Sequence, residues 1–331
     1  MCQEEVFLAD DVFYSNTLHV LTAIEFPVHL FGAFIVLTRT PPKMQPVKWS
    51  MLTLHTTGAT FDLFLSLLVA PVLAMPACAG YPLGVLTMLG VSTELQVYIG
   101  FVTVSALCAT IIGFFEDRCH VIGHVVSSER SWQRRAYLAL LYLISLVYIL
   151  PVLFAVPNQA EGALHVLHKI PCLARDVVNR HGFFTLSIDA TILLFCVVFI
   201  TILLTSQLLF FACSIAWKLS HSAATSKTVC RLQKQFMAAL AIQVSIPILI
   251  ILFPALFMVF QLWHGYFDQA ATNVCVIVVA THGALSTCTM LIVHKPYRQA
   301  STSVLCAPMK KARLDDYGAR IWKLSTVSIP N

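Results

Sequence analysis

The sequence predicts an all-α membrane protein, a seven-transmembrane helix bundle with the N-terminus outside and the C-terminus inside. Three observations lead to this prediction. Apolar residues dominate the composition, they gather in seven long runs, and the basic residues collect in the segments that join those runs on one side.

The composition points to lipid as the solvent. Of the 331 residues, 58% are hydrophobic and 11% are charged, and the mean hydropathy is +0.80. Soluble domains carry about 25% charged residues. A chain of this length cannot hide so much apolar surface in one water-soluble core, so a soluble helical bundle is the weaker interpretation.

Seven apolar segments are long enough to cross a bilayer, which takes about 20 helical residues. They span residues 17–38, 50–76, 91–115, 136–157, 183–216, 236–262 and 272–293. Stretches such as LLTSQLLFFACSIAW in the fifth segment show almost no polar face at the 3.6-residue spacing of a soluble amphipathic helix. We therefore expect seven membrane-spanning helices.

The basic residues predict the orientation of the bundle. Of the 21 lysines and arginines, all but Lys169, Arg175 and Arg180 lie in the connections on one side or after residue 293. Positive charge favours the cytoplasm, so this side is inside. We expect an extracellular N-terminus (1–16), a seven-helix domain (17–293) and a cytoplasmic tail (294–331).

The first two segments carry ionisable residues at membrane depth. Glu25 and His29 are spaced i, i+4, so they share one helix face and could simply satisfy one another. Asp62 lies near the middle of the second segment, where a carboxylate is costly and has to face the bundle interior. His282 and Ser286 of the seventh segment are its candidate partners. The alternative is a protonated Asp62 that makes a single interhelical hydrogen bond.

The third segment ends in a group of charges, in the sequence GFFEDR. Glu116, Asp117 and Arg118 follow each other at the expected cytoplasmic end of this helix. One interpretation is that Arg118 anchors the helix at the lipid headgroups. The favoured interpretation is that the acids restrain the arginine, because an anchor does not need two preceding acids, and that this charge pair biases the bundle between two packings.

The fifth and sixth segments each contain one candidate functional residue. Asp189 lies near the expected outer end of the fifth helix, either as a ligand contact or as a polar group in the packing. Pro247 interrupts the sixth segment and predicts a kink that could act as a hinge. Prolines also interrupt other segments, Pro71 in the second among them, so this signal is weak alone.

Most of the eleven cysteines lie in the predicted helices, where they pack as small apolar residues. Cys2, Cys78 and Cys172 could face the oxidising exterior. If a disulfide exists there, Cys78–Cys172 is the first choice.

The chain lacks the motifs of common enzyme classes. It contains no nucleotide-binding loop, no HExxH and no nucleophile elbow. His165, His168 and Cys172 do not complete a set of four ligands at zinc spacing. We therefore expect no enzymatic activity, no cofactor, no metal and no nucleic-acid partner.

Eight short motifs occur along the chain in a specific order. They are PPKMQPVKWSMLTLH, DLFLS, AGYPLG, FEDR, PCL, QVSIP, HGALST and HKPYR. This ordered set resembles the nematode serpentine receptors of class H, a family of chemoreceptors coupled to G proteins. The resemblance covers about residues 20–298. The chain has FEDR where members tend to have Phe-Glu-Asn-Arg, and HKPYR where rhodopsin-like receptors have NPxxY.

The resemblance implies a chemosensory G-protein-coupled receptor. Such a receptor would bind a small molecule in the outer half of the bundle and activate a heterotrimeric G protein. It would lie in the plasma membrane, in the cilia of sensory neurons. The alternative is a membrane transporter or channel subunit, which would more typically show internal symmetry or paired broken helices.

The resemblance also implies roles for the candidate residues. It makes the charged trio an activation switch, Pro247 a hinge in helix six, and Asp62 with Ser286 a polar or sodium site. The candidate ligand contacts are Asp189, Glu25, His29 and His282.

Overall fold

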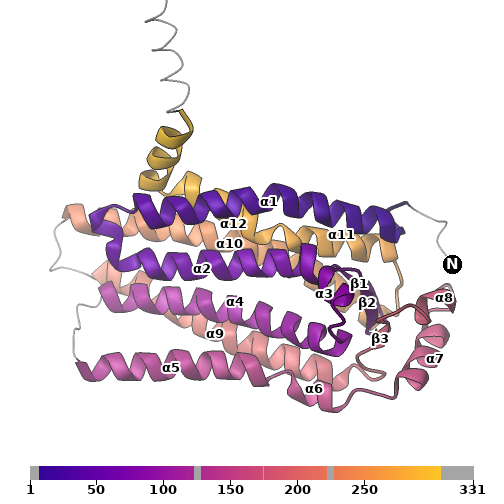
Figure 1. Ribbon diagram of the computed structural model, residues 1–331. Helices are drawn as coiled ribbons and strands as arrows, with labels where there is room; N and C mark the ends of the chain where they lie inside the picture. Colours follow the sequence, from indigo (N-terminus) through magenta and orange to yellow (C-terminus); the bar gives the residue numbers. More distant parts are fainter. Residues whose placement is uncertain (1–6, 123–127, 174, 222–226, 307–331) are drawn as a thin grey trace, which may run out of the picture.

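The computed structural model describes residues 7–122, 128–173, 175–221 and 227–306. In this part of the chain, seven helices are long and apolar enough to cross a membrane, and they pack side by side (Figure 1). They are α1 (Asp11–Arg39), α2 (Gln45–Leu63) with η3 (Phe64–Val69), α4 (Thr93–Ile122), α5 (Ser128–Val147) with α6 (Leu150–Phe154), α9 (Thr191–His221), α10 (Lys227–His264), and α11 (Gln269–Ala280) with α12 (His282–Val293). The predicted seven-helix bundle is confirmed.

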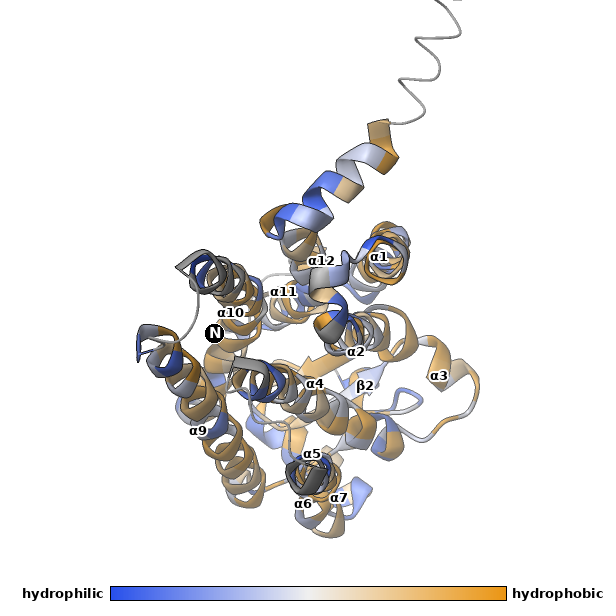
Figure 2. Cartoon of the chain, turned by 90° about the vertical axis from the view of Figure 1, so that its left-hand side faces the viewer, coloured by the Kyte–Doolittle hydropathy of each residue, from blue (hydrophilic) through white to orange (hydrophobic). Residues whose placement is uncertain are grey.

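The outward faces of the helices are apolar, as a lipid environment requires. Figure 2 shows the bundle along its length with ribbons that are predominantly orange, the colour of hydrophobic residues. Phe195 and Phe210 of α9 and Phe253 of α10 are each more than 60% exposed. A surface of this kind is stable against lipid tails and would aggregate in water.

The first helix begins earlier than expected. The carboxylate of Asp10 accepts a hydrogen bond from the backbone N–H of Phe13 at 2.8 Å, which caps α1 at its N-terminus. Residues 11–16, which the sequence placed in the extracellular segment, therefore belong to the first turns of α1.

The second apolar segment does not stay helical to residue 76. After the π-helical turn η3, Ala70 adopts a left-handed φ of 43°, and the chain enters β1 (Pro71–Ala74). Pro71 therefore begins a strand and does not bend a helix. Strand β1 pairs antiparallel with β2 (Ala79–Pro82), which pairs antiparallel with β3 (Phe184–Thr185). The fifth helix correspondingly begins at Thr191, after this strand, and not at residue 183.

The small sheet caps the end of the bundle at which α1 begins. Figure 1 shows it beside α7 (Gln159–Lys169) and α8 (Arg175–Val178) at that end. The hydroxyl of Tyr81 donates to the carboxylate of Asp11 at 2.9 Å. Arg180 pairs with the same carboxylate and lies 5.0 Å from the centre of the Tyr81 ring. These contacts tie the start of α1 to the sheet and to the long connection before α9.

The expected Cys78–Cys172 disulfide is not formed. Cys172 is disulfide-bonded, but Cys78 is a free thiol. The reason is local: the turn between β1 and β2, where Cys78 has a left-handed φ of 49°, packs against the sheet and leaves this residue only 8% exposed. Its carbonyl accepts a hydrogen bond from the N–H of Leu186 at 3.0 Å, which fixes the turn against the sheet. Burial raises the pKa of the Cys78 thiol.

The seventh span is broken, and a further helix follows it. Thr281 separates α11 from α12, so the N-terminus of α12 lies inside the bundle. After His294, residues 295–306 form a helix that turns away from the bundle (Figure 1). Tyr297 of the HKPYR motif is fully buried, and its hydroxyl lies 3.1 Å from Oγ1 of Thr40. The contact ties the start of this helix to the end of α1.

Candidate functional site

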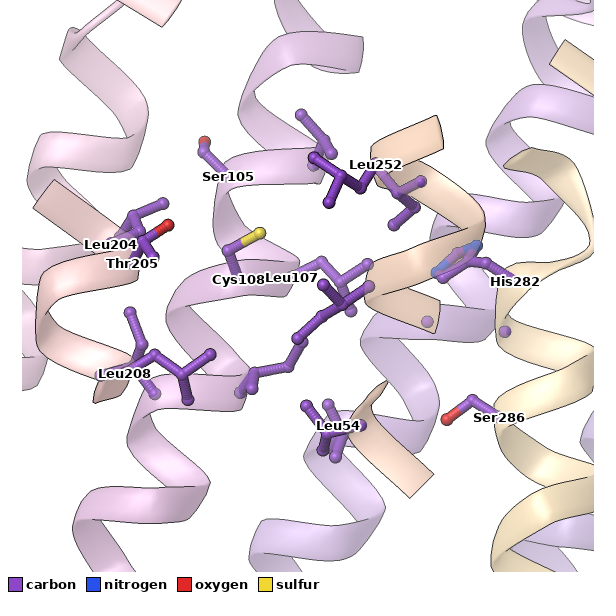
Figure 3. Close-up of a pocket in the computed structure, with 18 of the residues that line it drawn as sticks. Leu54, Ser105, Leu107, Cys108, Leu204, Thr205, Leu208, Leu252, His282 and Ser286 are labelled. Atoms are coloured by element: carbon purple, nitrogen blue, oxygen red, sulfur yellow. The ribbon is translucent and has the colours of Figure 1, made fainter. Parts of the chain in front are cut away.

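A cavity of about 420 Å³ lies in the middle of the bundle (Figure 3). Residues of α2, α4, α9, α10 and α12 line it, and most of these side chains are apolar, including Leu54, Leu107, Leu204, Leu208 and Leu252. Ligand pockets typically enclose about 300–1,000 Å³ and combine apolar walls with a few polar groups. The cavity is therefore large enough for a small organic molecule.

Two polar residues of α12 face this cavity. Figure 3 shows His282 and Ser286 on one helix, across from Ser105 and Cys108 of α4. The sequence had selected both as candidates. His282 is buried, and among the described residues none forms a hydrogen bond with its Nε2. This nitrogen is itself buried, so it is an unpartnered polar atom in the wall of the cavity and not at its surface.

One wall of the cavity reaches the outer surface of the bundle. Thr201 and Thr205 of α9 and Leu252 and Ala255 of α10 line the cavity, and all four are exposed. The cavity thus borders the lipid-facing surface between α9 and α10.

Asp62 is the centre of a buried polar cluster behind the cavity. It has no exposed surface, and its carboxylate contacts four donors. Nδ1 of His282 lies 2.5 Å from Oδ1, and Nε2 of His29 lies 3.2 Å from Oδ2. The backbone N–H groups of Gly283 and Ala284 donate to Oδ1 and Oδ2 at 3.1 and 2.8 Å. The expected partner His282 is present, whereas Ser286 lines the cavity and does not contact Asp62.

The break in the seventh span explains why a carboxylate is stable at this depth. A helix N-terminus has N–H groups without intrahelical partners and carries partial positive charge, so an acid is stabilised there. Gly283 permits the approach, because a Cβ at this position would lie 2.5 Å from Oδ2 of Asp62. The side chain of Asp62, which belongs to α2, therefore caps the N-terminus of α12.

A chain of hydrogen-bonding groups extends the cluster toward His55. Oγ1 of Thr287 lies 3.4 Å from Nδ1 of His29 and 3.1 Å from Nδ1 of His55. Nε2 of His55 donates to the carbonyl of His29 at 2.9 Å. The sequence analysis did not select His55 or Thr287. Both lie in the quoted motifs, MLTLH and HGALST, but no spacing rule pairs them.

Glu25 lies beside this cluster without joining its hydrogen bonds. It is 2% exposed, and among the described residues none donates to either of its carboxylate oxygens. The mutual satisfaction of Glu25 and His29 that their spacing allowed is therefore absent. One ligand atom each of Glu25, His29 and Asp62 lies within 4.8 Å of the others.

The charged trio at the end of α4 is held by α2 and α5. Nη2 of Arg118 lies 2.6 Å from Oδ2 of Asp117, which also accepts a hydrogen bond from Ser50 at 3.1 Å. Glu116 is instead bound at both oxygens by Arg134 of α5, at 2.7 and 2.8 Å. Arg134 also reaches Asp117 at 3.2 Å. The sequence selected the trio but assigned Glu116 to Arg118, because a partner 18 residues away leaves no local pattern.

Two other predicted site residues lie away from the cavity. Asp189 precedes α9 as an exposed residue, and its carboxylate accepts hydrogen bonds from N and Oγ1 of Thr191 at 3.0 and 2.7 Å. These bonds lower the pKa of the Asp189 carboxyl. Asp189 therefore caps α9 and does not line the cavity. Pro247 lies inside α10, which continues from Lys227 to His264, and its side chain is outside the described part of the structure.

Comparisons with known proteins agree with this architecture. Residues 9–307 match the family described as "Serpentine type 7TM GPCR chemoreceptor Srh". Serpentine receptor class H-72 of Caenorhabditis elegans is 25% identical over 288 residues, which cover 84% of this chain and 81% of that protein. Squid rhodopsin shares the fold, with a TM-score of 0.51 at 13% identity over 99% of this chain and 94% of its own. The protein is thus a multi-pass membrane protein that belongs to the Srh family of seven-transmembrane chemoreceptors, within the G-protein-coupled receptors.

Proposed function

We propose that this protein binds a small, largely apolar molecule in the central cavity and in response activates a heterotrimeric G protein. The cavity of about 420 Å³ carries this proposal, because its apolar walls enclose one unpartnered nitrogen of His282. Family membership favours this function over that of a transporter or channel subunit. The cavity proposed as the site lies at mid-depth in the bundle, whereas the sequence analysis expected a ligand in the outer half.

The His282 ring suggests the chemistry of the ligand. Its Nδ1 contacts Asp62 and the carbonyl of Val279, both of which are acceptors, so this nitrogen carries the proton. Nε2 is then left with a lone pair in the cavity wall, which a ligand would reach after a small shift of the side chains around it. A ligand with an apolar body and one hydroxyl or N–H group fits this arrangement.

The exposed wall between α9 and α10 suggests the route of entry. The sheet, α7 and α8 cap the N-terminal end of the bundle, whereas Thr201 and Leu252 connect the cavity with the lipid-facing surface. An apolar ligand concentrates in the bilayer, so this route raises its local concentration. We propose that the ligand enters from the lipid.

The opposite end of the bundle is the proposed site of the G protein. Arg118 lies there near the end of α4, and the exposed residues Arg135, Arg231 and Lys234 add positive charge to the same end of the bundle. Such a rim suits an acidic or amphipathic helix of the partner. We propose that this end of the bundle faces the cytoplasm. Movement of α10, with Pro247 as the hinge, would open a groove there for the helix of the partner. The receptor would act in the plasma membrane, in the cilia of sensory neurons, as the resemblance implies.

A cavity-filling substitution tests the ligand site. Thr205 and Ser206 are adjacent on α9, but only Thr205 lines the cavity. Cells that express the receptor are challenged with apolar alcohols and amines and read by cAMP, cGMP and calcium reporters. Thr205→Phe should abolish a response that Ser206→Phe retains. Equal responses of the two variants at equal surface expression would exclude the cavity as the ligand site.

A further inference from the structure

A second candidate site lies beside the cavity but does not line it. Glu25 and His29 of α1 and Asp62 of α2 are 2%, 5% and 0% exposed. One ligand atom of each lies within 4.8 Å of the other two. His282, Gly283 and Thr287 line the cavity and also contact this cluster, the first two through Asp62 and the third through His29.

Glu25 carries the evidence that the cluster binds something. Both of its carboxylate oxygens are buried, and no donor in the described parts of the chain reaches them. An ionised carboxylate at membrane depth is costly and normally faces a partner or a bound cation. The four donors around Asp62 contact the Asp62 carboxylate. They therefore do not balance the negative charge of the Glu25 carboxylate.

We propose that Glu25, His29 and Asp62 bind one divalent transition-metal ion of the zinc type. Two carboxylates and one imidazole are ligands that zinc accepts, whereas Na⁺, Mg²⁺ and Ca²⁺ prefer oxygen alone. A dication also neutralises the two carboxylates, which suits a site enclosed by apolar helices. Zinc bonds of about 2.0–2.2 Å place ligand atoms about 3.4 Å apart, so the Glu25 side chain, now within 4.8 Å of the other two ligand atoms, has to move by about 1.5 Å or less.

The hydrogen bonds around His29 fit this ion. A metal on Nε2 leaves the proton on Nδ1, which can then donate to Oγ1 of Thr287 across 3.4 Å. The hydroxyl of Thr287 donates to the carbonyl of Gly283 at 2.8 Å, so its oxygen can accept this bond, and Nε2 of His55 donates to the carbonyl of His29. Without a metal, a neutral His29 that donates to Asp62 leaves its Nδ1 as an acceptor beside the Thr287 hydroxyl, which already donates to the carbonyl of Gly283.

The surroundings of Asp62 fit a ligating carboxylate as well. His282 and Gly283 hold Oδ1, and the N–H of Ala284 holds Oδ2 while leaving a lone pair toward His29. Ligating carboxylates in proteins are usually oriented by such outer hydrogen bonds. The ion would connect α1 and α2 with the N-terminus of α12. This inference does not depend on the ligand or on the G protein.

Metal titration of the purified, chelator-treated receptor tests the proposal. Co²⁺ serves as the spectroscopic probe and Zn²⁺ as the stabilising ion. We expect one equivalent of Co²⁺ to produce a visible absorption band, one equivalent of Zn²⁺ to displace it, and Zn²⁺ to raise the unfolding temperature. Excess Na⁺ or Mg²⁺ should not displace the ion. A wild-type receptor that takes up neither metal would overturn the proposal and would assign a proton to Glu25.

Matched substitutions locate the site. Glu25→Gln and His29→Gln should weaken Zn²⁺ binding by about 100-fold or more, since removal of a second-shell partner alone costs about 10–100-fold. Thr287→Val, which removes such a partner, should weaken binding by about 10-fold while keeping the three ligands. Glu94→Gln and His264→Gln change exposed residues and should bind as the wild type does. Unchanged Zn²⁺ affinity in a folded Glu25→Gln receptor, or displacement by Na⁺, would contradict the assignment.

Discussion

At the residue scale, His294 shows how burial produces a dependence on pH. It is buried where α12 ends, with Nε2 3.0 Å from Oε1 of Gln243, and burial lowers its pKa to about 4. The unfolded value is about 6.5. Because the folded pKa is the lower one, protonation favours the unfolded chain. We expect the stability from this residue to be complete above pH 6.5 and to be lost between about pH 6.5 and 4, by at most about 3 kcal/mol.

The measurement is the unfolding temperature of the solubilised receptor at pH 7.5 and pH 5. His294→Gln should lower the difference between the two values, because its amide does not titrate. His264→Gln removes an exposed histidine and should leave that difference unchanged. Equal pH dependence in all three proteins would show that another group titrates.

Single residues could be selected from the sequence more easily than their contacts. The cost of charge at membrane depth identified Asp62 and Glu25 as interior residues, and both are buried. The contacts of Asp62 with Gly283 and Ala284 depend on a break in the seventh span that hydropathy does not reveal. The pairing of Glu116 with Arg134 likewise depends on how α4 and α5 are rotated against each other.

At the element scale, the close contact of α2 and α12 depends on Gly283. A Cβ at Gly283 would lie 2.5 Å from Asp62 and 2.9 Å from the carbonyl of Gly58, so Gly283→Ala has to separate the helices. We expect a loss of about 1–3 kcal/mol in the free energy of unfolding, typical of overpacking. The control is Gly58→Ala in the same contact, where the nearest atom would lie 3.7 Å away. If both variants unfold at the wild-type temperature, the helices are not this closely packed.

The ends of the elements were less predictable than their existence. All seven spans were expected, but the second was extended through residues that form β1. An apolar run such as PVLA has no period that separates a buried strand from a helix. Pro71 and the left-handed Ala70 end the helix there, and the strand forms because β2 and β3 supply its hydrogen bonds.

The contact of α4 with α5 and α2 gives a prediction about activation. Asp117 holds Arg118 at 2.6 Å, so Asp117→Asn should raise activity without ligand. Loss of a restraint of about 1.4 kcal/mol raises a small active population about tenfold.

Arg118→Ala should bind ligand and fail to activate the G protein. The readouts are reporter signal and ligand binding at matched surface expression, with Arg135→Ala as the exposed control. Normal signalling by Arg118→Ala would mean that Glu116, Asp117 and Arg118 only anchor α4 at the lipid headgroups.

At the scale of the whole molecule, composition and charge distribution set the architecture. Apolar runs of sufficient length predicted a bundle, and the structure packs them around a central cavity. Neither the cavity nor the cap of three strands could be predicted, because both arise from contacts between distant segments. The orientation in the membrane is predicted from the basic residues alone, and it is the subject of a separate prediction.

That prediction is an N-terminus outside the cell and a C-terminus inside. The end of the bundle with Arg135, Arg231 and Lys234 is basic, and positive charge is retained in the cytoplasm. An epitope before residue 1 should therefore be labelled on intact cells, and an epitope after residue 331 only once the membrane is permeabilised. A receptor with both epitopes added serves as its own control, since each cell then reports both sides. The reverse labelling would place Arg118 outside, where no G protein could reach it, and would refute the proposed coupling.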